Sequence, residues 1–202
     1  MAPPMTTVEQ QLREAANDMA KIGAKFAVVG GLAVSARAEP RMTRDADLAI
    51  AVQSDQEAES VIFAMQRLGY SVLAVVEQEA TGRMSTVRLE TKGSVITDLL
   101  FASSGIEQDI VERATLISVI PGLILPVACV GDLIAMKLLA RDDRQRPNDA
   151  DDLRALREVA TDADWETARI AAIAIQERGY SRQRDLVAAL DSLISNGAYG
   201  HS

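Results

Sequence analysis

Three acidic residues in predicted strands are the side chains best suited to chemistry. Asp45 and Asp47 stand two residues apart at the start of a predicted strand, so the strand period places both carboxylates on one face. Asp98 lies inside the apolar segment 95–101, where a charge is costly unless it is paired or binds a metal. Close carboxylates without a nearby His or Cys favour Mg²⁺ or Mn²⁺ over zinc. The alternative for each acid is a solvated position at the surface or at a strand end.

Two adjacent glycines form a second candidate feature. Gly30 and Gly31 follow the predicted strand 25–29 and precede a predicted helix over 32–38. A backbone without side chains can approach a ligand closely, and the N-terminus of a helix offers unpaired N–H groups to an anion. This pattern favours phosphate binding, and a plain tight turn is the alternative.

The elements that must position these residues follow from the hydrophobic periodicity. Helices are predicted over residues 8–22, 32–38, 55–68, 106–114, 130–139, 149–159, 164–177 and 182–194. Strands are predicted over residues 25–29, 45–52, 71–76, 85–91, 94–101, 116–120 and 123–127, with a turn at Lys92-Gly93. This order predicts an α/β (α+β) fold, with a catalytic α/β domain over 1–128 and a helical C-terminal part over 129–202 packed on it.

Composition limits the classes of function. The chain has 202 residues and a formal net charge of −8, which argues against general DNA binding through summed Lys and Arg contacts. A single cysteine, Cys129, and the absence of a basic and apolar leader favour the cytoplasm. The uncharged segment 114–131 is long enough to cross a membrane, but turn residues interrupt it, so two short buried strands are expected instead. The interrupting residues are Ser118, Pro121, Gly122 and Pro126.

Taken together, these motifs resemble the polymerase-β-type nucleotidyltransferase superfamily, and within it most closely the AbiEii/AbiGii toxin family. The resemblance covers roughly residues 7–157. The segments that carry it are Gly30-Gly31-Leu32-Ala33, Arg41-Met42-Thr43-Arg44-Asp45-Ala46-Asp47-Leu48, the strand acid Asp98, Asp132-Leu133-Ile134-Ala135-Met136-Lys137-Leu138, and Asn148-Asp149-Ala150-Asp151-Asp152-Leu153. Two features depart from the family pattern: Asn148 stands where a basic residue often precedes the late aspartate, and the connector 141–147 is long and polar.

The resemblance implies a nucleotidyltransferase fold, a mixed twisted sheet flanked by helices, and a role for each matched residue. Asp45 and Asp47 would hold the Mg²⁺ (or Mn²⁺) that bridges the triphosphate of an NTP. Asp98 would complete a second metal position or accept the proton of the attacking hydroxyl, and Lys137 would share in catalysis. The residues implied to bind the nucleotide are Gly30, Gly31, Arg41, Thr43 and Lys137.

The resemblance also implies a function. The expected reaction moves a nucleotide from an NTP to a hydroxyl of a macromolecular acceptor, a tRNA or a protein. The chain would then be the toxin-like component of a toxin–antitoxin system, with a cognate antitoxin as partner and no membrane association. The alternatives are a nucleotidyltransferase that modifies a small molecule such as an aminoglycoside, and a non-catalytic nucleotide-binding or antitoxin-like module of the same fold.

Several charged residues around these motifs have two interpretations. Lys137 lies on an otherwise apolar helix and needs a negative partner, either the triphosphate and metal-site acids or a surface acid such as Asp132 or Asp152. Asp149 either belongs to the site or caps its helix. Basic residues near both motif regions could form one basic opening to the site if the fold brings the regions together. They are Arg37, Arg41, Arg44, Lys137, Arg141, Arg144 and Arg146.

Overall fold

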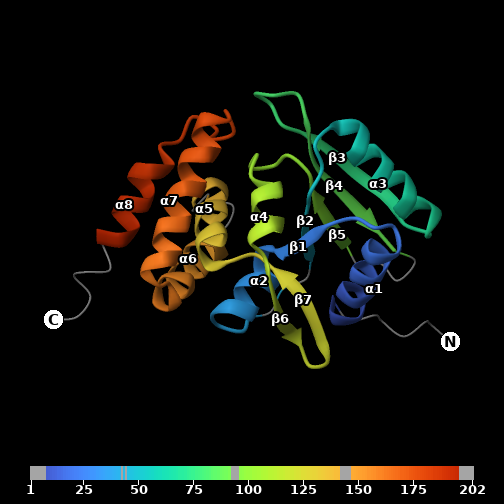
Figure 1. Cartoon of the computed structure of the whole chain (residues 1–202), viewed down its shortest axis with the longest axis horizontal. Coiled ribbons are helices and arrows are strands. Elements are labelled where there is room, and N and C mark those ends of the chain that lie inside the picture. Colours follow the sequence, from blue (N-terminus) through green and yellow to red (C-terminus); the bar gives the residue numbers. More distant parts are fainter. Residues whose placement is uncertain (1–7, 42, 44, 92–95, 142–146, 196–202) are drawn as a thin grey trace.

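The fold is a seven-stranded sheet with eight helices, seen in a computed structural model that describes residues 8–41, 43, 45–91, 96–141 and 147–195 (Figure 1). The strands are β1 (Phe26–Val29), β2 (Ala46–Ile50), β3 (Ser71–Glu77), β4 (Met84–Glu90), β5 (Ile96–Leu100), β6 (Thr115–Ile120) and β7 (Leu123–Val127). The helices are α1 (Val8–Lys21), α2 (Gly30–Arg37), α3 (Asp55–Arg67), α4 (Glu107–Arg113), α5 (Val130–Ala140), α6 (Pro147–Val159), α7 (Asp162–Glu177) and α8 (Leu186–Ser195).

These elements match the predicted ones to within four residues at each end, and the starts of two helices have a local explanation. Helix α2 begins at Gly30, two residues before the predicted start, so both glycines belong to its first turn. Helix α8 begins at Leu186 and not at residue 182, because the successive residues Arg182 and Gln183 have positive φ angles of 53° and 61°, and a helix cannot continue through them. The predicted turn at Lys92-Gly93 lies outside the described residues.

The sheet is mixed, with the strand order β3-β4-β5-β2-β1-β7-β6. Strand β2 runs parallel to β5 and antiparallel to β1, and β1 runs parallel to β7. The central strand β2 is buried except at one position, because Ala46, Leu48, Ala49 and Ile50 are buried while Asp47 is partly exposed. Asp47 is thus the polar residue in an otherwise apolar strand, and this strand lies at the middle of the sheet. A residue that is strained or costly to place there usually marks a functional site.

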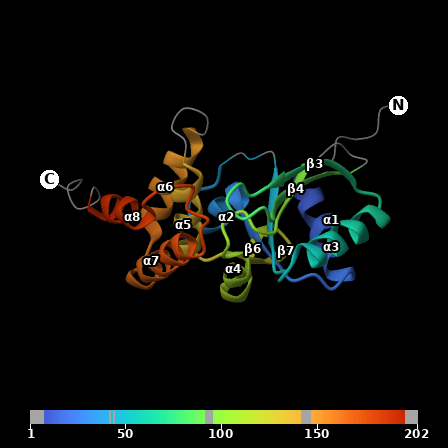
Figure 2. The ribbon, with the colours of Figure 1, turned by 90° about the horizontal axis from the view of Figure 1, so that it is seen from above.

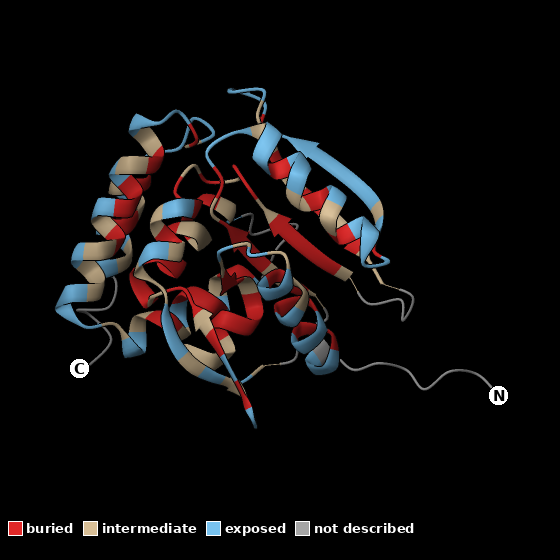
Figure 3. Ribbon diagram, turned by 45° about the vertical axis from the view of Figure 1, so that its right-hand side comes forward, coloured by how far each residue is buried: buried red, intermediate tan, exposed pale blue. Residues whose placement is uncertain are grey.

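The helices are divided between the two ends of the molecule. Figures 1 and 2 show α5 to α8 gathered at one end and α1 and α3 at the other. Helix α2 joins the two ends, since it contacts β1 and β2 of the sheet and also α5 and α6. One continuous hydrophobic core runs through both ends, and Figure 3 shows it along the central strands and the inner helix faces. The domain boundary at residue 128 stays a prediction.

The uncharged segment 114–131 forms no membrane helix. It contains β6 and β7, which pair antiparallel around Gly122 at a φ of 73°, as the interrupting turn residues predict. Among the residues that the structure describes, no helix is long and apolar enough to cross a membrane.

Candidate active site

The acids Asp47 and Asp98 lie side by side at the centre of the sheet. The parallel strands β2 and β5 pair in a register that sets Asp47 opposite Asp98. Register partners on neighbouring strands point to the same face of a sheet, so the two carboxylates share one face. Asp45 precedes β2 by one residue and stands two residues before Asp47. The fold thus gathers the three acids that the sequence singled out.

Electrostatics at Asp47 show how closely these charges lie. Burial, followed by the charges of Asp98 and Asp45, raises the pKa of Asp47 from its usual 3.8 to about 6. Lys137 and Arg88 act in the opposite direction and lower this pKa. Two cations therefore stand near the acids, yet they do not offset the repulsion and burial. A further cation at this position would relieve that repulsion.

Asp47 should make the metal-free protein less stable at neutral pH. Its folded pKa is raised, so its contribution to stability is fully present below pH 3.8 and is lost as pH rises through about 6. We expect Asp47→Asn to match the wild type near pH 4 and to be more stable by about 1–3 kcal/mol above pH 6.5. Urea unfolding in EDTA across this pH range measures the difference. A variant that is less stable at pH 7.5 would contradict it.

The two glycines leave room for the acids and their neighbours. Gly30 has a φ of +64°, and a Cβ on it would lie 1.9 Å from Oδ2 of Asp47. A Cβ on Gly31 would lie 2.6 Å from Nη2 of Arg41 and 3.0 Å from Oγ1 of Thr43. A plain tight turn explains the positive φ of Gly30. It does not explain why a Cβ added to either glycine would overlap a neighbouring side chain. The first turn of α2 is thus packed directly against Asp47, Arg41 and Thr43.

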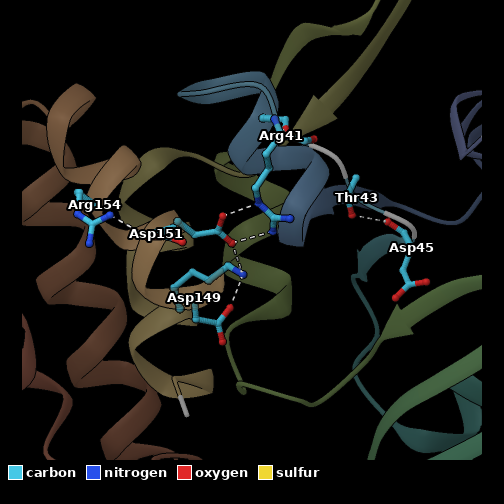
Figure 4. Close-up of polar contacts among 9 residues, drawn as sticks. Arg41, Thr43, Asp45, Asp149, Asp151 and Arg154 are labelled. Atoms are coloured by element: carbon cyan, nitrogen blue, oxygen red, sulfur yellow. Dashed lines mark hydrogen bonds and ion pairs between the residues drawn. The ribbon is translucent and has the colours of Figure 1, made fainter. Parts of the chain in front are cut away.

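A second charged cluster links the segment between α2 and β2 with α5 and α6 (Figure 4). Nε and Nη2 of Arg41 donate to the two oxygens of Asp152 at 2.6 and 2.9 Å. Nζ of Lys137 lies 2.6 Å from Oδ1 of Asp149 and 2.7 Å from Oδ2 of Asp152. Figure 4 shows Arg41 extending toward α6, while Thr43 and Asp45 follow on the segment that leads to β2. Asp149 and Asp152 thus bind the two cations that the sequence assigned to the nucleotide.

Burial makes this cluster important for folding. Asp149 and Asp152 are 4% and 0% exposed, and Oδ2 of Asp149 is buried without a hydrogen-bond partner among the described residues. The interpretation of Lys137 as a side chain reaching a surface acid is therefore wrong in one respect, because its partners are buried. An unmatched carboxylate oxygen beside Lys137 is a feature that a bound ligand or water could satisfy.

Removing the charge of Lys137 should destabilise the protein strongly. In Lys137→Met, Asp149 loses its ion-pair partner, while Asp152 keeps its ion pair with Arg41. We expect the free energy of unfolding at pH 7.5 to fall by about 3 kcal/mol, because an uncompensated buried charge is costly. Urea denaturation measures the loss. Lys21→Met is the matched control, since the exposed pair of Lys21 with Asp18 should contribute less than about 0.5 kcal/mol. Equal losses in both variants would refute this account of the cluster.

Several described residues of the predicted basic opening bond to other groups within the protein. Arg37 donates to the backbone oxygens of Val127 and Ala128 and to the hydroxyl of Thr115, so it ties α2 to the β6–β7 hairpin. Arg41 and Lys137 are paired with acids of α6. Residues 44, 144 and 146 lie outside the described residues. In the described part of the predicted opening, Arg41 and Lys137 are therefore neutralised by acids, whereas the printed bonds of Arg37 go to uncharged groups.

Sequence reasoning missed Arg88. Its Nε and Nη2 donate to the two oxygens of Asp98 at 2.9 and 2.7 Å, across the register pair of β4 and β5. Aligning the predicted strands 85–91 and 94–101 around a turn at 92–93 brings residue 88 within one position of residue 98, so this signal was available. Within the described ranges, no three His, Cys, Asp or Glu side chains are arranged to hold a metal as they stand. Arg88 gives a reason, since it occupies both oxygens of Asp98.

Comparison with known proteins decides the family. The family model described as nucleotidyl transferase AbiEii toxin, Type IV TA system, matches residues 15–196. The chain belongs to this family. Membership confirms the resemblance seen in the sequence and identifies the chain as a nucleotidyltransferase-type enzyme. No curated protein is similar enough in sequence to count as a match.

Solved structures support the fold of this AbiEii family member. An antigenic nucleotidyltransferase-like protein from Paracoccidioides brasiliensis superposes with a TM-score of 0.52 and 16% identity, over 91% of this chain and 92% of that chain. The lincosamide antibiotic adenylyltransferase LnuA, solved with lincomycin bound, gives a TM-score of 0.53 and 14% identity, over 76% of this chain and 99% of that chain. At these identities the likeness shows the fold alone, and it confirms the predicted α/β nucleotidyltransferase fold.

Proposed function

We propose that this AbiEii family member is a metal-dependent enzyme that moves a nucleotide from an NTP to a hydroxyl of a tRNA or protein. It would act in the cytoplasm as the toxin of a toxin–antitoxin system. One observation carries the proposal: Asp47 lies against Gly30 at the start of α2, where a Cβ on the glycine would overlap the carboxylate, and Asp98 is the register partner of Asp47 on β5. This arrangement supports the proposal, because backbone N–H groups suited to phosphate lie beside acids suited to a metal.

The donor chemistry of the three acids suits a divalent ion, although Arg88 holds both oxygens of Asp98 in this structure. Asp45, Asp47 and Asp98 are hard oxygen ligands of the kind that Mg²⁺ and Mn²⁺ prefer. The repulsion that raises the pKa of Asp47 is what such an ion would relieve. When bound, the ion would supply charge neutralisation for the triphosphate and the pyrophosphate that leaves it.

The chain's own residues would orient the substrates. The N–H groups in the first turn of α2, at Gly30 and Gly31, offer donors to phosphate oxygens. Thr43 adds a hydroxyl beside Gly31. The attacking hydroxyl oxygen forms a bond to the α-phosphorus, the bond from that phosphorus to the pyrophosphate breaks, and the hydroxyl proton passes to a carboxylate, for which Asp98 is our candidate. Positioning and electrostatics supply most of the catalysis in such reactions.

Lys137 would bring the helical part into the same reaction. It lies on α5, in the part that we assign to residues 129–202, yet its charge reaches Asp47. We propose that Lys137 faces the triphosphate together with Arg41 while Asp149 and Asp152 hold both cations in place. On this proposal the catalytic domain over 1–128 is incomplete without α5 and α6.

Transfer of label from the α-phosphate tests the function. The purified full chain is incubated with Mg²⁺, each NTP labelled at the α- or γ-phosphate, total tRNA and cell lysate. We expect α-label, and no γ-label, in a fraction sensitive to ribonuclease or protease, and growth arrest on expression that a neighbouring antitoxin gene relieves. Label on a small cationic antibiotic alone would support the small-molecule alternative. Nucleotide binding with no transfer would support the non-catalytic one.

A further inference from the structure

Arg88 stands among all the acids that the proposed reaction needs. Its guanidinium binds both oxygens of Asp98, and its side chain is 43% exposed while that of Asp98 is 12% exposed. One cation from strand β4 therefore binds Asp98, the register partner of Asp47.

The position of this cation conflicts with metal binding as the acids now stand. A carboxylate whose two oxygens both accept bonds from a guanidinium has little capacity left for a cation. Asp98 is fixed within a buried strand, with Thr97 and Leu99 1% and 0% exposed. Arg88 has a long side chain that is partly in solvent, so it is the member of the pair that can move.

We propose that Arg88 is a displaceable counter-cation, which holds Asp98 in the metal-free enzyme and turns to the triphosphate when metal and nucleotide enter together. This inference rests on the proposed function and adds a nucleotide-binding role for Arg88. Displacing Arg88 by metal alone leaves the guanidinium without its anion, whereas a triphosphate provides a new one. Metal binding without nucleotide is therefore weakened by Arg88, and binding of the metal–nucleotide complex is strengthened by it.

Opposite changes in two affinities test the inference. Mn²⁺ alone is titrated into the full chain and followed by its paramagnetic resonance, and α,β-methylene analogues of the four ribonucleotides are titrated with Mg²⁺ present. For Arg88→Ala we expect Mn²⁺ to bind about tenfold more tightly and the analogue about tenfold more weakly. Arg83→Ala is the matched control, because Arg83 precedes the same strand and pairs with Asp55, away from the three acids. It should change neither affinity.

Stability gives a second readout that does not depend on catalysis. In EDTA, Arg88→Ala should have a lower melting temperature than the wild type because Asp98 loses its partner, and saturating Mg²⁺ should narrow the difference. Arg88→Gln serves the same comparison if the alanine variant folds poorly. Mn²⁺ affinity that is unchanged or reduced, or analogue affinity that is unchanged, overturns the role of Arg88 while leaving the metal site in place. If neither the wild type nor Arg88→Ala binds Mn²⁺, with or without the nucleotide analogue, the proposed function is overturned, and this inference with it.

Discussion

Gly30→Ala should abolish activity and destabilise the protein. An alanine at a φ of +64° costs about 1 kcal/mol, because L-residues rarely adopt this conformation. Its Cβ would also lie 1.9 Å from Oδ2 of Asp47, so either the carboxylate or the first turn of α2 must move. We expect the free energy of unfolding to fall by about 2–3 kcal/mol and nucleotidyl transfer to fall below about 1% of the wild type.

A matched glycine separates the overlap from the backbone cost. Gly23 has a φ of +71° at the end of α1, and a Cβ on it would meet nothing within 4 Å. Gly23→Ala should therefore lose about 1 kcal/mol of stability and keep full activity. Urea denaturation and the α-label transfer assay are run on both variants. If the two variants behave alike, the contact of Gly30 with Asp47 does not matter to the site.

Asp47→Asn should cost the most activity while sparing the fold. An amide keeps the shape of the carboxylate but offers one oxygen and no charge to a divalent ion. Loss of a metal ligand at the reacting phosphate is worth several kcal/mol in the transition state, so we expect transfer to fall about 10³-fold or more. The Asp47→Asn variant should lose this activity although it is more stable than the wild type at neutral pH. Burial and the neighbouring acids make the ionised carboxylate of Asp47 unfavourable, and the amide has no such charge.

Local patterns in the sequence were sufficient to predict the candidate acids and glycines. Each of these patterns involves only a few neighbouring residues, so it can be interpreted without knowledge of the fold. The patterns are the two-residue spacing of Asp45 and Asp47, the apolar surroundings of Asp98 and the position of Gly30 after a strand. The strands and helices were predicted for the same reason. The early start of α2 could not be anticipated, because two glycines are poor helix formers and only the packing against Asp47 and Arg41 holds them there.

Partners across the fold could not be predicted from the sequence. The ion pair of Arg41 with Asp152 joins residues 111 positions apart, and it forms because α2 packs between the sheet and α6. The same packing turns Arg37 toward the β7 backbone. Arg88 differs from these, since its partner lies only ten residues away, and strand register alone decides that Asp98 is the residue it meets.

The central claim is that the acids beside Gly30 form the metal and nucleotide site of a transferase. The most direct measurement compares α-label transfer by the wild type, Asp47→Asn and the surface control Asp151→Asn, which alters an exposed acid paired with Arg154. We expect Mg²⁺-dependent transfer by the wild type and Asp151→Asn, and transfer at least about 10³-fold lower by Asp47→Asn with its fold intact. Equal transfer by Asp47→Asn and the wild type would contradict it.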